Sequence, residues 1–328
     1  MARLRLSLAC GDYDRTRALE EESVRPDGIE LTFVRLPVEE IFFRMMRHRE
    51  FDVAEMSLSS YVLSLHQDPQ PFVAIPVFTS RMFRHSSIYC HVGSGVEAPE
   101  DLRGKDVGTP EFQLTAGVWV RGLLAEHHGV PVDSVRYLTG GQETPGRVEK
   151  QAVASGLDIQ AIGPGKTLAR MLVDGEISAL YTPRIPSPFA AGDPRVRRLF
   201  ADVVETEQDY FARTGIFPIM HVMSIRREVY ERDPWVAQSL VKAFALAKQK
   251  AEAELYDSSA LRIMSPWLVQ QLEAARHLLG PDFWSYGLEP NRDVLSTFLR
   301  YHHGQGLSPR LVSPDELFVP ESTESALI

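Results

Sequence analysis

The sequence predicts an α/β protein built from two lobes, each a mixed β-sheet flanked by helices. Short apolar segments alternate with helical segments along the chain, an order typical of sheets with helices packed against them. The length of 328 residues is about twice that of an average domain. In addition, residues 87–92 and 215–225 look like passages of the chain from one lobe to the other. Two crossover segments therefore complete the predicted architecture.

The first lobe is predicted from a repeated strand–helix–strand order. Its most informative segment starts at Pro37, which favours a first helical turn, and Glu39 and Glu40 follow at the end of the helix dipole that attracts acidic groups. A repeated β-α-β order predicts a parallel or mixed sheet with right-handed crossovers. The expected strands are 4–10, 29–36, 51–54 and 72–77, and the expected helices are 13–22 and 37–49.

The second lobe is predicted to begin near Val92. A loop from Thr109 leads into a helix that ends at Gly129, with Thr115 as its candidate N-cap. The next expected elements of this lobe are a strand at 135–138, a helix at 167–175 and a strand and loop at 179–184. After the second crossing we expect a long helix at 233–255 and then a helical and irregular tail. We expect lobe 1 to comprise residues 1–87 and 218–328, lobe 2 to comprise residues 92–215, and a ligand cleft to lie between them.

Composition and charge narrow the class of partner. The net charge of −9 argues against a nucleic-acid-binding surface, because phosphate binding needs a basic patch. No apolar run approaches the roughly 20 residues of a membrane span, and Leu4, Leu6 and Leu8 alternate as in a strand rather than a secretory signal. The two cysteines, Cys10 and Cys90, form no metal-binding pattern. These features predict a cytoplasmic protein with a small-molecule partner, and neither a nucleic acid nor a membrane.

A polar cluster follows the strand predicted at 51–54. Glu55, Ser57, Ser60 and Tyr61 stand where a parallel strand would end. Ligands of open α/β sheets bind at the carboxyl ends of the strands, so the cluster predicts one wall of a binding site. Serine and tyrosine after a strand also commonly cap the next helix, which is the structural alternative.

Six segments spread over most of the chain carry a family resemblance. They are residues 6–15, 37–61, 83–86, 181–184, 217–221 and 226–230. The sequence resembles the 4,5-dihydroxyphthalate decarboxylase family, an enzymatic branch of the type 2 periplasmic-binding-protein fold. The resemblance implies a cofactor-independent carboxy-lyase that acts on a small aromatic di-acid, converting 4,5-dihydroxyphthalate to protocatechuate and CO2.

Two other hypotheses remain beside the decarboxylase. Many relatives are labelled only as substrate-binding proteins, so the first alternative is a non-catalytic solute-binding protein for an aromatic or heterocyclic anion. The second is a cytoplasmic enzyme of another pathway, since pyrimidine-synthesis enzymes share the two-lobed fold. Homo-oligomerisation is left open.

Decarboxylation of such a substrate requires a cation for the retained carboxylate, an acid near the ring and an acceptor at the phenol. Arg84 and Arg184 are the candidate cations, because a guanidinium binds a carboxylate through two parallel hydrogen bonds. Arg81 is a third choice. An arbitrary arginine, by contrast, more often belongs to a surface salt bridge.

Histidines are the candidate acid and base. His85 and His221 are chosen because histidine changes its protonation near neutral pH, although a lone histidine among apolar residues is more often a hydrogen-bonded core residue. Glu55 is a candidate base or a group that orients a histidine, and its structural alternative is a helix cap. No cofactor is expected, but a metal held by Glu55, His85 and His221 stays open.

Further side chains near strand ends complete the candidate site. The hydroxyls of Ser57, Ser60 and Tyr61 suit the catechol oxygens. Thr109, Gln113 and Thr115 stand at a helix start, where an anion is favoured. Asp12 and Tyr13 follow the first strand, where capping of the next helix is the alternative. The predicted substrate-binding residues, besides the arginines, are Ser57, Ser60, Tyr61, Asp12, Tyr13, Thr109, Gln113 and Thr115.

Overall fold

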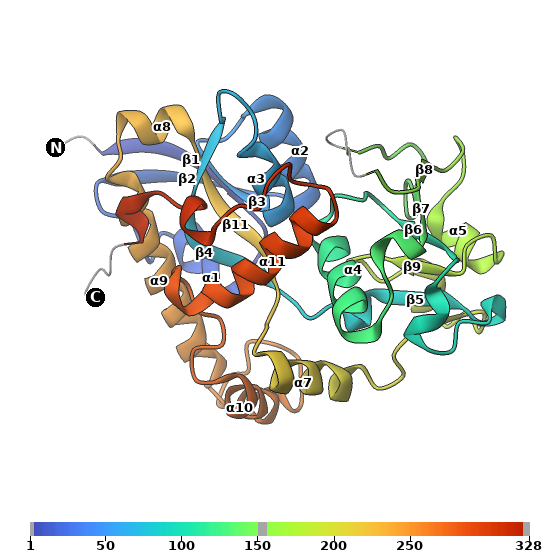
Figure 1. The fold of residues 1–328 in the computed structure, drawn as a ribbon. Coiled ribbons are helices and arrows are strands. Elements are labelled where there is room, and N and C mark those ends of the chain that lie inside the picture. The colour runs from blue at the N-terminus through green and yellow to red at the C-terminus, as the bar shows by residue number, and fades with distance from the viewer. Residues whose placement is uncertain (1–2, 150–155, 324–328) are drawn as a thin grey trace. The chain divides into compact units, whose positions relative to one another are not determined.

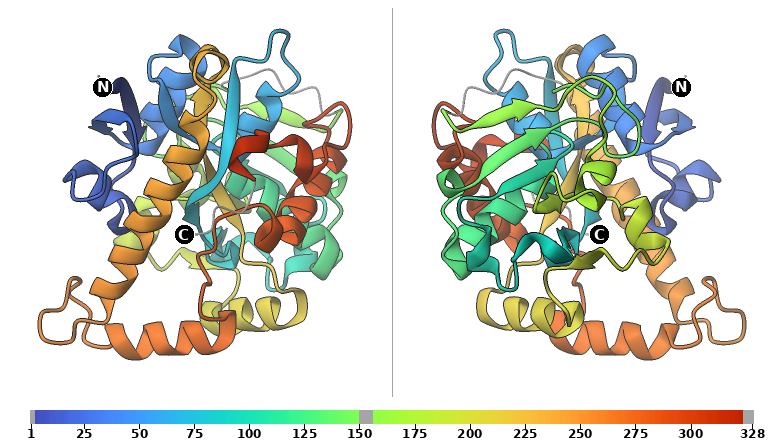
Figure 2. Two further views of the ribbon diagram at one scale, coloured as in Figure 1. Left: turned by 90° about the vertical axis from the view of Figure 1, so that its left-hand side faces the viewer. Right: turned by 90° about the vertical axis from the view of Figure 1, so that its right-hand side faces the viewer.

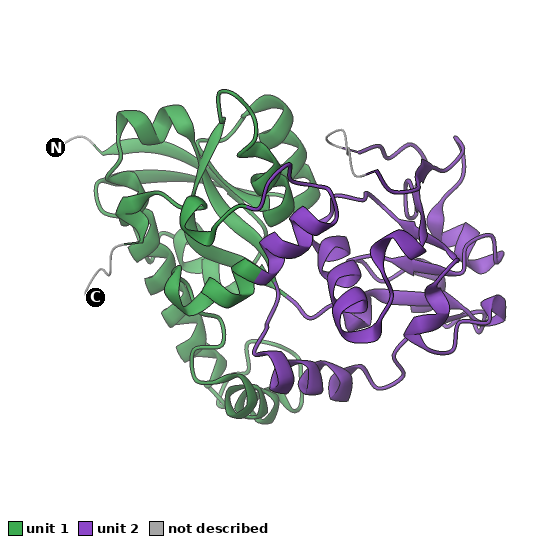
Figure 3. Ribbon diagram, viewed as in Figure 1, with its two compact units in different colours: residues 1–81, 219–296, 312–328 green, residues 82–218, 297–311 purple. Residues whose placement is uncertain are grey.

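The computed structural model describes residues 3–149 and 156–323, which group into two compact units (Figure 3). Unit 1 consists of Met1–Arg81, Ile219–Ser296 and Val312–Ile328. Unit 2 consists of Met82–Pro218 and Thr297–Leu311. Each unit is an α/β body with its own mixed sheet, which confirms the predicted fold class.

Unit 1 is built on a five-stranded sheet in the order β2-β1-β3-β11-β4 (Figure 1). β11 runs antiparallel between β3 and β4, whereas β1 pairs in parallel with both β2 and β3. The carboxyl ends of β1, β3 and β4 therefore share one edge with the start of β11. The strands are β1 (Leu4–Cys10), β2 (Ile29–Arg35), β3 (Val53–Ser57), β4 (Phe72–Arg81) and β11 (Ile219–Arg226).

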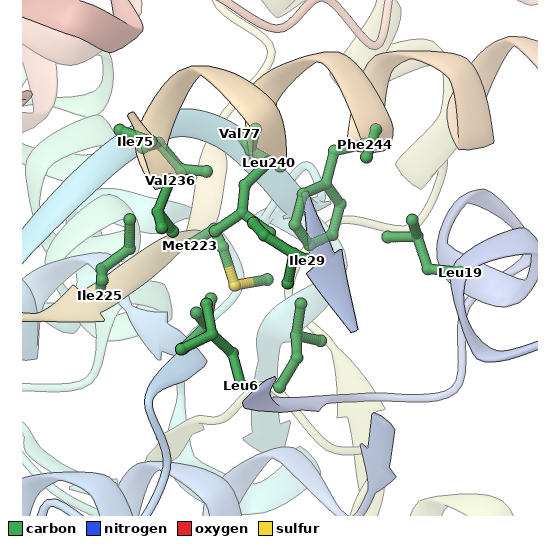
Figure 4. Packing of buried hydrophobic residues seen from close by; sticks show 14 of the residues in the cluster. Leu6, Leu19, Ile29, Ile75, Val77, Met223, Ile225, Val236, Leu240 and Phe244 are labelled. Atoms are coloured by element: carbon green, nitrogen blue, oxygen red, sulfur yellow. The ribbon is translucent and has the colours of Figure 1, made fainter. Parts of the chain in front are cut away.

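Helices cover this sheet, and the long helix α9 supplies much of the core (Figures 2 and 4). Val236, Leu240 and Phe244 recur every four residues of α9, so they share one helix face and are fully buried in a cluster with strand residues such as Met223 and Ile225. The helices of unit 1 are α1 (Asp14–Glu20), α2 (Val38–His48), α3 (Leu58–Ser64), α8 (Arg227–Arg232), α9 (Val236–Leu255) and α10 (Leu268–Leu279).

The helix predicted after Pro37 is confirmed as α2. Pro37 occupies the N-cap position, and Glu39 and Glu40 lie in the first turn. The helix ends at Arg49, which has a left-handed backbone with φ of 49° and donates its N–H to the carbonyl of Met45. This ending turns the chain directly into β3, the strand that carries Glu55.

Unit 2 contains a six-stranded sheet in the order β10-β5-β9-β6-β7-β8. β6, β7, β8 and β9 are parallel, and β5 is antiparallel to both of its neighbours. The strands are β5 (Ile88–His91), β6 (Asp106–Thr109), β7 (Arg136–Thr139), β8 (Ile159–Ala161), β9 (Ala179–Tyr181) and β10 (Val196–Arg198). The helices are α4 (Thr115–His128), α5 (Leu168–Val173), α6 (Ser187–Ala190) and α7 (Val203–Thr214), and α11 (Arg292–Gly304) begins in unit 1 and ends in unit 2.

The boundaries of the two units differ from the predicted lobes mainly at two places. Lobe 1 was expected to extend to residue 87, whereas the first segment of unit 1 ends at Arg81 and 82–87 belong to unit 2, where His85 packs against Phe200 and Tyr210. The sequence assigned the whole of 218–328 to lobe 1, whereas 297–311 belongs to unit 2. The reason is side-chain packing, because Phe298 and Tyr301 contact Trp119 of α4 with ring centroids 5.5 and 5.8 Å apart. Gln305 adds a hydrogen bond of 2.8 Å from the buried Arg121.

Three local predictions also need correction. Both expected crossings consist mostly of strand: 88–91 of the segment 87–92 form β5 in the sheet of unit 2, and most of 215–225 is the inner strand β11 of unit 1. β3 runs from Val53 to Ser57 rather than over 51–54, so Glu55 and Ser57 lie within the strand rather than after it. Thr115 is the first residue of α4, and Leu114 holds the N-cap position. In the described part of the chain, no helix is both long and apolar enough to cross a membrane.

Candidate active site

Glu55 is the centre of a polar network at the edge of the unit 1 sheet. It lies near the carboxyl end of β3 and has no exposed surface. Its Oε1 accepts hydrogen bonds from the Tyr13 hydroxyl at 2.7 Å and the Thr79 hydroxyl at 2.8 Å, and Oε1 is 2.6 Å from His221 Nδ1. Its Oε2 accepts the backbone N–H of Gly11 at 2.9 Å. The carboxylate is thus held by four partners, which come from β4, β11 and the turn after β1.

These partners keep Glu55 ionised. Burial by itself would raise the pKa of the carboxyl, but the charge and hydrogen bond of His221, with hydrogen bonds from Gly11 and Tyr13, lower the pKa to about 2. The same buried charge acts on its neighbours. Burial and the Glu55 carboxylate raise the pKa values of Tyr13 and of the Cys10 thiol, which lies 3.6 Å from Oε2. Both groups therefore stay protonated and serve as donors.

His221 is a partly exposed member of the network. Its side chain is 16% exposed, and the edge of Phe42 fixes the ring at a centroid distance of 4.9 Å. With Nδ1 engaged by Glu55, the hydrogen is placed on that nitrogen, and Nε2 has no hydrogen-bond partner among residues 3–149 and 156–323. This is the arrangement in which a buried carboxylate orients a histidine and leaves its other nitrogen for a reacting molecule.

An irregularity in β4 lies beside this histidine. His221 pairs with Ser80, but Met223 pairs with Ile75, so the register shifts between the two positions. Such bulges often occur next to active sites, because they redirect side chains at the end of a strand. Here Thr79 lies within the bulge, and its hydroxyl reaches Glu55.

The structure brings together three of the residues that the sequence singled out: Glu55, His221 and Tyr13. It also adds contacts from Cys10, Gly11 and Thr79, which the sequence analysis did not select. Cys10 and Gly11 could have been found from their place directly after the first strand. Thr79 could not, because β4 was expected to end at residue 77.

Other predicted residues of unit 1 make different contacts. Asp12 is exposed and pairs with Arg35 at 3.3 Å. Tyr61 is buried and donates its hydroxyl to the Leu317 carbonyl at 2.5 Å. Arg81 is buried and donates to the Ser285 carbonyl at 2.8 Å and to Asn291, and burial lowers its pKa to about 9. We leave these side chains out of the candidate site. Ser57 and Ser60, also buried, stay predictions as ligand contacts.

His85, a predicted acid or base, lies in unit 2 among aromatic rings. It is 1% exposed, its ring centroid lies 5.0 Å from that of Tyr210 and 5.3 Å from that of Phe200, and its Nδ1 has no partner among the described residues. Burial, followed by the charges of His128 and His127, lowers its pKa to about 4. A histidine in these surroundings is neutral at pH 7, so we do not assign the proton donor to it.

The two predicted anchors are placed differently within unit 2. Arg84 is buried, donates to Ser87 Oγ at 3.4 Å, and has a pKa that burial lowers to about 10. Arg184 is exposed in the loop after β9, where its backbone N–H contacts Thr182 Oγ1 at 3.3 Å. Their roles toward a substrate stay predictions.

Thr109, Gln113 and Thr115 are buried around the start of α4 in unit 2. Gln113 donates to Glu111 at 3.2 Å, while its Oε1 has no partner within the described segments. Glu111 in turn pairs with Arg147 at 2.6 Å. These three residues also stay predictions as substrate contacts.

The candidate metal ligands do not form a recognisable ion site. Within residues 3–149 and 156–323, no group of three His, Cys, Asp or Glu side chains is arranged to hold a metal ion. Glu55 and His221 contact each other directly in unit 1, and His85 belongs to unit 2.

Two mixed α/β sheets, each flanked by helices, define a protein of the type 2 periplasmic-binding-protein fold. Solved structures with this fold match the chain over nearly its full length. The aliphatic sulphonate binding protein of Escherichia coli covers 99% of the chain, with 94% of its own chain matched, at a TM-score of 0.55 and 13% identity. A Candida albicans protein with the generic fold covers 93%, with 91% of its own chain matched, at a TM-score of 0.50 and 13% identity. A desulfurization enzyme covers 98%, with 98% of its own chain matched, at a TM-score of 0.52 and 16% identity.

The relatives with curated names are much more similar in sequence. The 4,5-dihydroxyphthalate decarboxylase of Comamonas testosteroni is 43% identical over 327 residues, which is 99% of both chains. That of Pseudomonas putida is 42% identical over 213 residues, which is 64% of this chain and 83% of the relative. No family model matches the sequence. The chain belongs to the 4,5-dihydroxyphthalate decarboxylase family.

Proposed function

We propose that the protein decarboxylates 4,5-dihydroxyphthalate to protocatechuate and CO2. The observation that supports this most strongly is the 43% identity to a 4,5-dihydroxyphthalate decarboxylase over 99% of both chains. The Glu55–His221 pair supports it independently, because the reaction needs a group that delivers a proton to an aromatic carbon. His221 is the group of this pair that can deliver that proton.

In the proposed reaction, His221 delivers the proton. The substrate has two adjacent carboxylates, each para to a hydroxyl. Electron density from the para oxygen moves into the ring as the protonated His221 donates a proton from Nε2 to the carbon that bears the leaving carboxylate. The bond to that carboxylate then breaks, CO2 leaves, and the bonding pair restores the aromatic ring. The overall reaction consumes one proton, which His221 regains from solvent.

Glu55 supports this step electrostatically. An imidazolium is stabilised by an adjacent anion, and the four partners of Glu55 keep its carboxylate ionised and fixed. Because Nδ1 faces Glu55, Nε2 is the nitrogen that exchanges the proton. Glu55 is therefore proposed as the residue that positions and charges His221 rather than as a base toward the substrate.

We further propose that the reaction needs no metal or organic cofactor. The hydroxyl oxygen para to the leaving carboxylate donates electron density when the ring is protonated and regains it when CO2 leaves, so the substrate itself accommodates the electron pair of the broken bond. Activity is expected to survive dialysis against a strong chelator, with metal analysis as the control. A cytoplasmic location is also proposed, since Cys10 and Cys90 are both free thiols.

The direct test is to incubate the purified protein with 4,5-dihydroxyphthalate and to measure CO2 and protocatechuate together. Equal amounts of both products are expected. A second incubation with phthalate serves as the matched control, because phthalate has the two carboxylates but lacks the para hydroxyls that donate electron density. Tight binding of 4,5-dihydroxyphthalate without release of CO2 would instead indicate a solute-binding protein.

A further inference from the structure

We propose that Arg15 binds the retained carboxylate of the substrate, next to the proton donor His221. The inference builds on the proposed function, and it assigns a residue that sequence reasoning did not select. Arg15 lies in the first turn of α1, directly after the edge of the sheet where Glu55 and His221 meet. Its guanidinium is fixed in place, yet one of its donor groups has no partner among the residues that the structure describes.

Two aromatic rings hold the guanidinium of Arg15. Its central carbon lies 4.2 Å from the ring centroid of Tyr13 and 4.3 Å from that of Trp284. The Trp284 ring is itself held, since its Nε1 donates to the Phe78 carbonyl at 2.9 Å. A guanidinium stacked on aromatic faces keeps its planar edge for hydrogen bonds, so the stacking orients Arg15 without using its donors.

The donors of Arg15 are only partly used. Nε donates to the Thr79 carbonyl at 2.7 Å, and Nη1 donates to Asp14 Oδ1 at 2.9 Å. Nη2 has no hydrogen-bond partner in the described segments, and the side chain remains 16% exposed. Arg81, by comparison, donates from Nη2 to the Ser285 carbonyl and to Asn291 Oδ1. Arg15 is therefore an oriented, partly exposed arginine whose Nη2 can donate to a carboxylate.

The same residues that hold Arg15 also connect it to the proton donor. Tyr13 stacks on Arg15 and donates its hydroxyl to Glu55 Oε1, and Thr79 accepts from Arg15 through its carbonyl while its hydroxyl donates to the same oxygen. That oxygen contacts His221. One residue thus separates Arg15 from the carboxylate that orients His221. The two carboxylates of the substrate are on adjacent ring carbons. When His221 protonates the carbon of the leaving carboxylate, the retained carboxylate therefore lies close to His221, in the region where Arg15 is held.

A purely structural role is the alternative, in which Arg15 only ties α1 to β4. Ligands that differ by one carboxylate separate the two roles. Protocatechuate carries the retained carboxylate, whereas catechol has the same two hydroxyls and no carboxylate. A structural defect weakens the binding of both ligands, but loss of a carboxylate contact weakens only that of protocatechuate.

The experiment measures the binding of protocatechuate and catechol by calorimetry to the wild type, Arg15→Gln and Arg15→Lys. For Arg15→Gln, protocatechuate affinity is expected to fall about 10- to 100-fold, while catechol affinity changes less than about twofold. Arg15→Lys keeps the charge but loses the planar fork, so it should recover part of the loss. Arg17→Gln on the same helix is the control, because the Arg17 side chain is about half exposed and its guanidinium pairs with Asp12 at 3.7 Å.

Equal losses for both ligands, or no loss for protocatechuate, would overturn the inference. Melting temperatures of all variants show whether they fold, and if Arg15→Gln does not fold, the comparison is made with Arg15→Lys, which must still lose protocatechuate affinity selectively. The inference and the proposed function fail separately. If the wild type releases CO2 and Arg15→Gln binds protocatechuate normally, only the role of Arg15 is ruled out. If binding depends on Arg15 but the wild type releases no CO2, only the decarboxylase function is ruled out.

Discussion

His221 Nδ1 lies 2.6 Å from Oε1 of Glu55, and that carboxylate has no exposed surface. The pair differs from a surface ion pair because every other hydrogen bond to Glu55 also comes from the protein, so the anion cannot turn away from the histidine. A fixed anion in a water-poor site interacts more strongly with a neighbouring charge than it would in water. The relationship makes His221 the residue on which the chemistry is expected to depend.

Replacement of His221 by Gln is expected to lower the turnover number by about 100- to 10,000-fold while substrate binding changes little, because the proton is transferred only in the transition state. Steady-state kinetics and calorimetric binding of protocatechuate measure the two effects separately. The exposed His277 of α10 supplies the control variant His277→Gln, which should keep full activity. Unchanged turnover in His221→Gln would rule out the proposed proton donor.

Stability is expected to fall at acidic pH through Glu55. Its folded-state pKa of about 2 lies below the ordinary value of 4.5, so the ionised carboxylate stabilises the fold above pH 4.5, and this contribution is lost as the pH falls toward 2. The shift corresponds to on the order of 3 kcal/mol. Urea unfolding of wild type and Glu55→Gln at pH 7 and pH 3 should show a smaller pH effect in the variant. Glu30→Gln, at a half-exposed position, should behave as wild type, and an unchanged pH effect in Glu55→Gln would contradict the assignment.

The strands and helices that local pattern determines were predictable from the sequence. The strand at 4–10 agrees to the residue with β1, because the alternating Leu4, Leu6 and Leu8 mark a strand with one buried face. The helix after Pro37 agrees within one residue at each end with α2, where acidic and basic residues mark the two termini. Both signals lie within the element itself.

The site could be predicted only in part, because its geometry depends on sheet order. Glu55 and His221 are 166 residues apart, and they meet because β11 inserts antiparallel between β3 and β4. The apolar residues around His221 are equally consistent with a crossing segment. Likewise, nothing local to Phe298 indicates that it packs against Trp119. Contacts that depend on such long-range pairing have no local signature.

The α9 helix is expected to contribute strongly to the stability of unit 1. Leu240 is fully buried against the sheet, so Leu240→Ala should reduce the free energy of unfolding by about 2–5 kcal/mol. Leu246 on the same helix is 42% exposed, and Leu246→Ala should have a much smaller effect. Urea unfolding followed by circular dichroism compares the two. Equal effects would show that α9 does not pack on the sheet through the face that carries Leu240.

Gly122 of α4 is expected to be required for the packing of residues 297–311 onto unit 2. A Cβ atom at this position would lie 2.0 Å from Cδ2 of the Tyr301 ring, so Gly122→Ala should destabilise the fold by about 1–3 kcal/mol, even though alanine favours a helix by up to about 1 kcal/mol.

Two further variants test that explanation by thermal or urea unfolding. Gly304→Ala in α11 is the matched control, because its Cβ would meet no atom within 4 Å, and its stability should match or exceed that of the wild type. Tyr301→Leu should make Gly122→Ala less harmful, since the smaller side chain removes the close contact; the two effects are therefore expected to be non-additive. Additive effects would show that Gly122 is needed for a reason other than the approach of Tyr301.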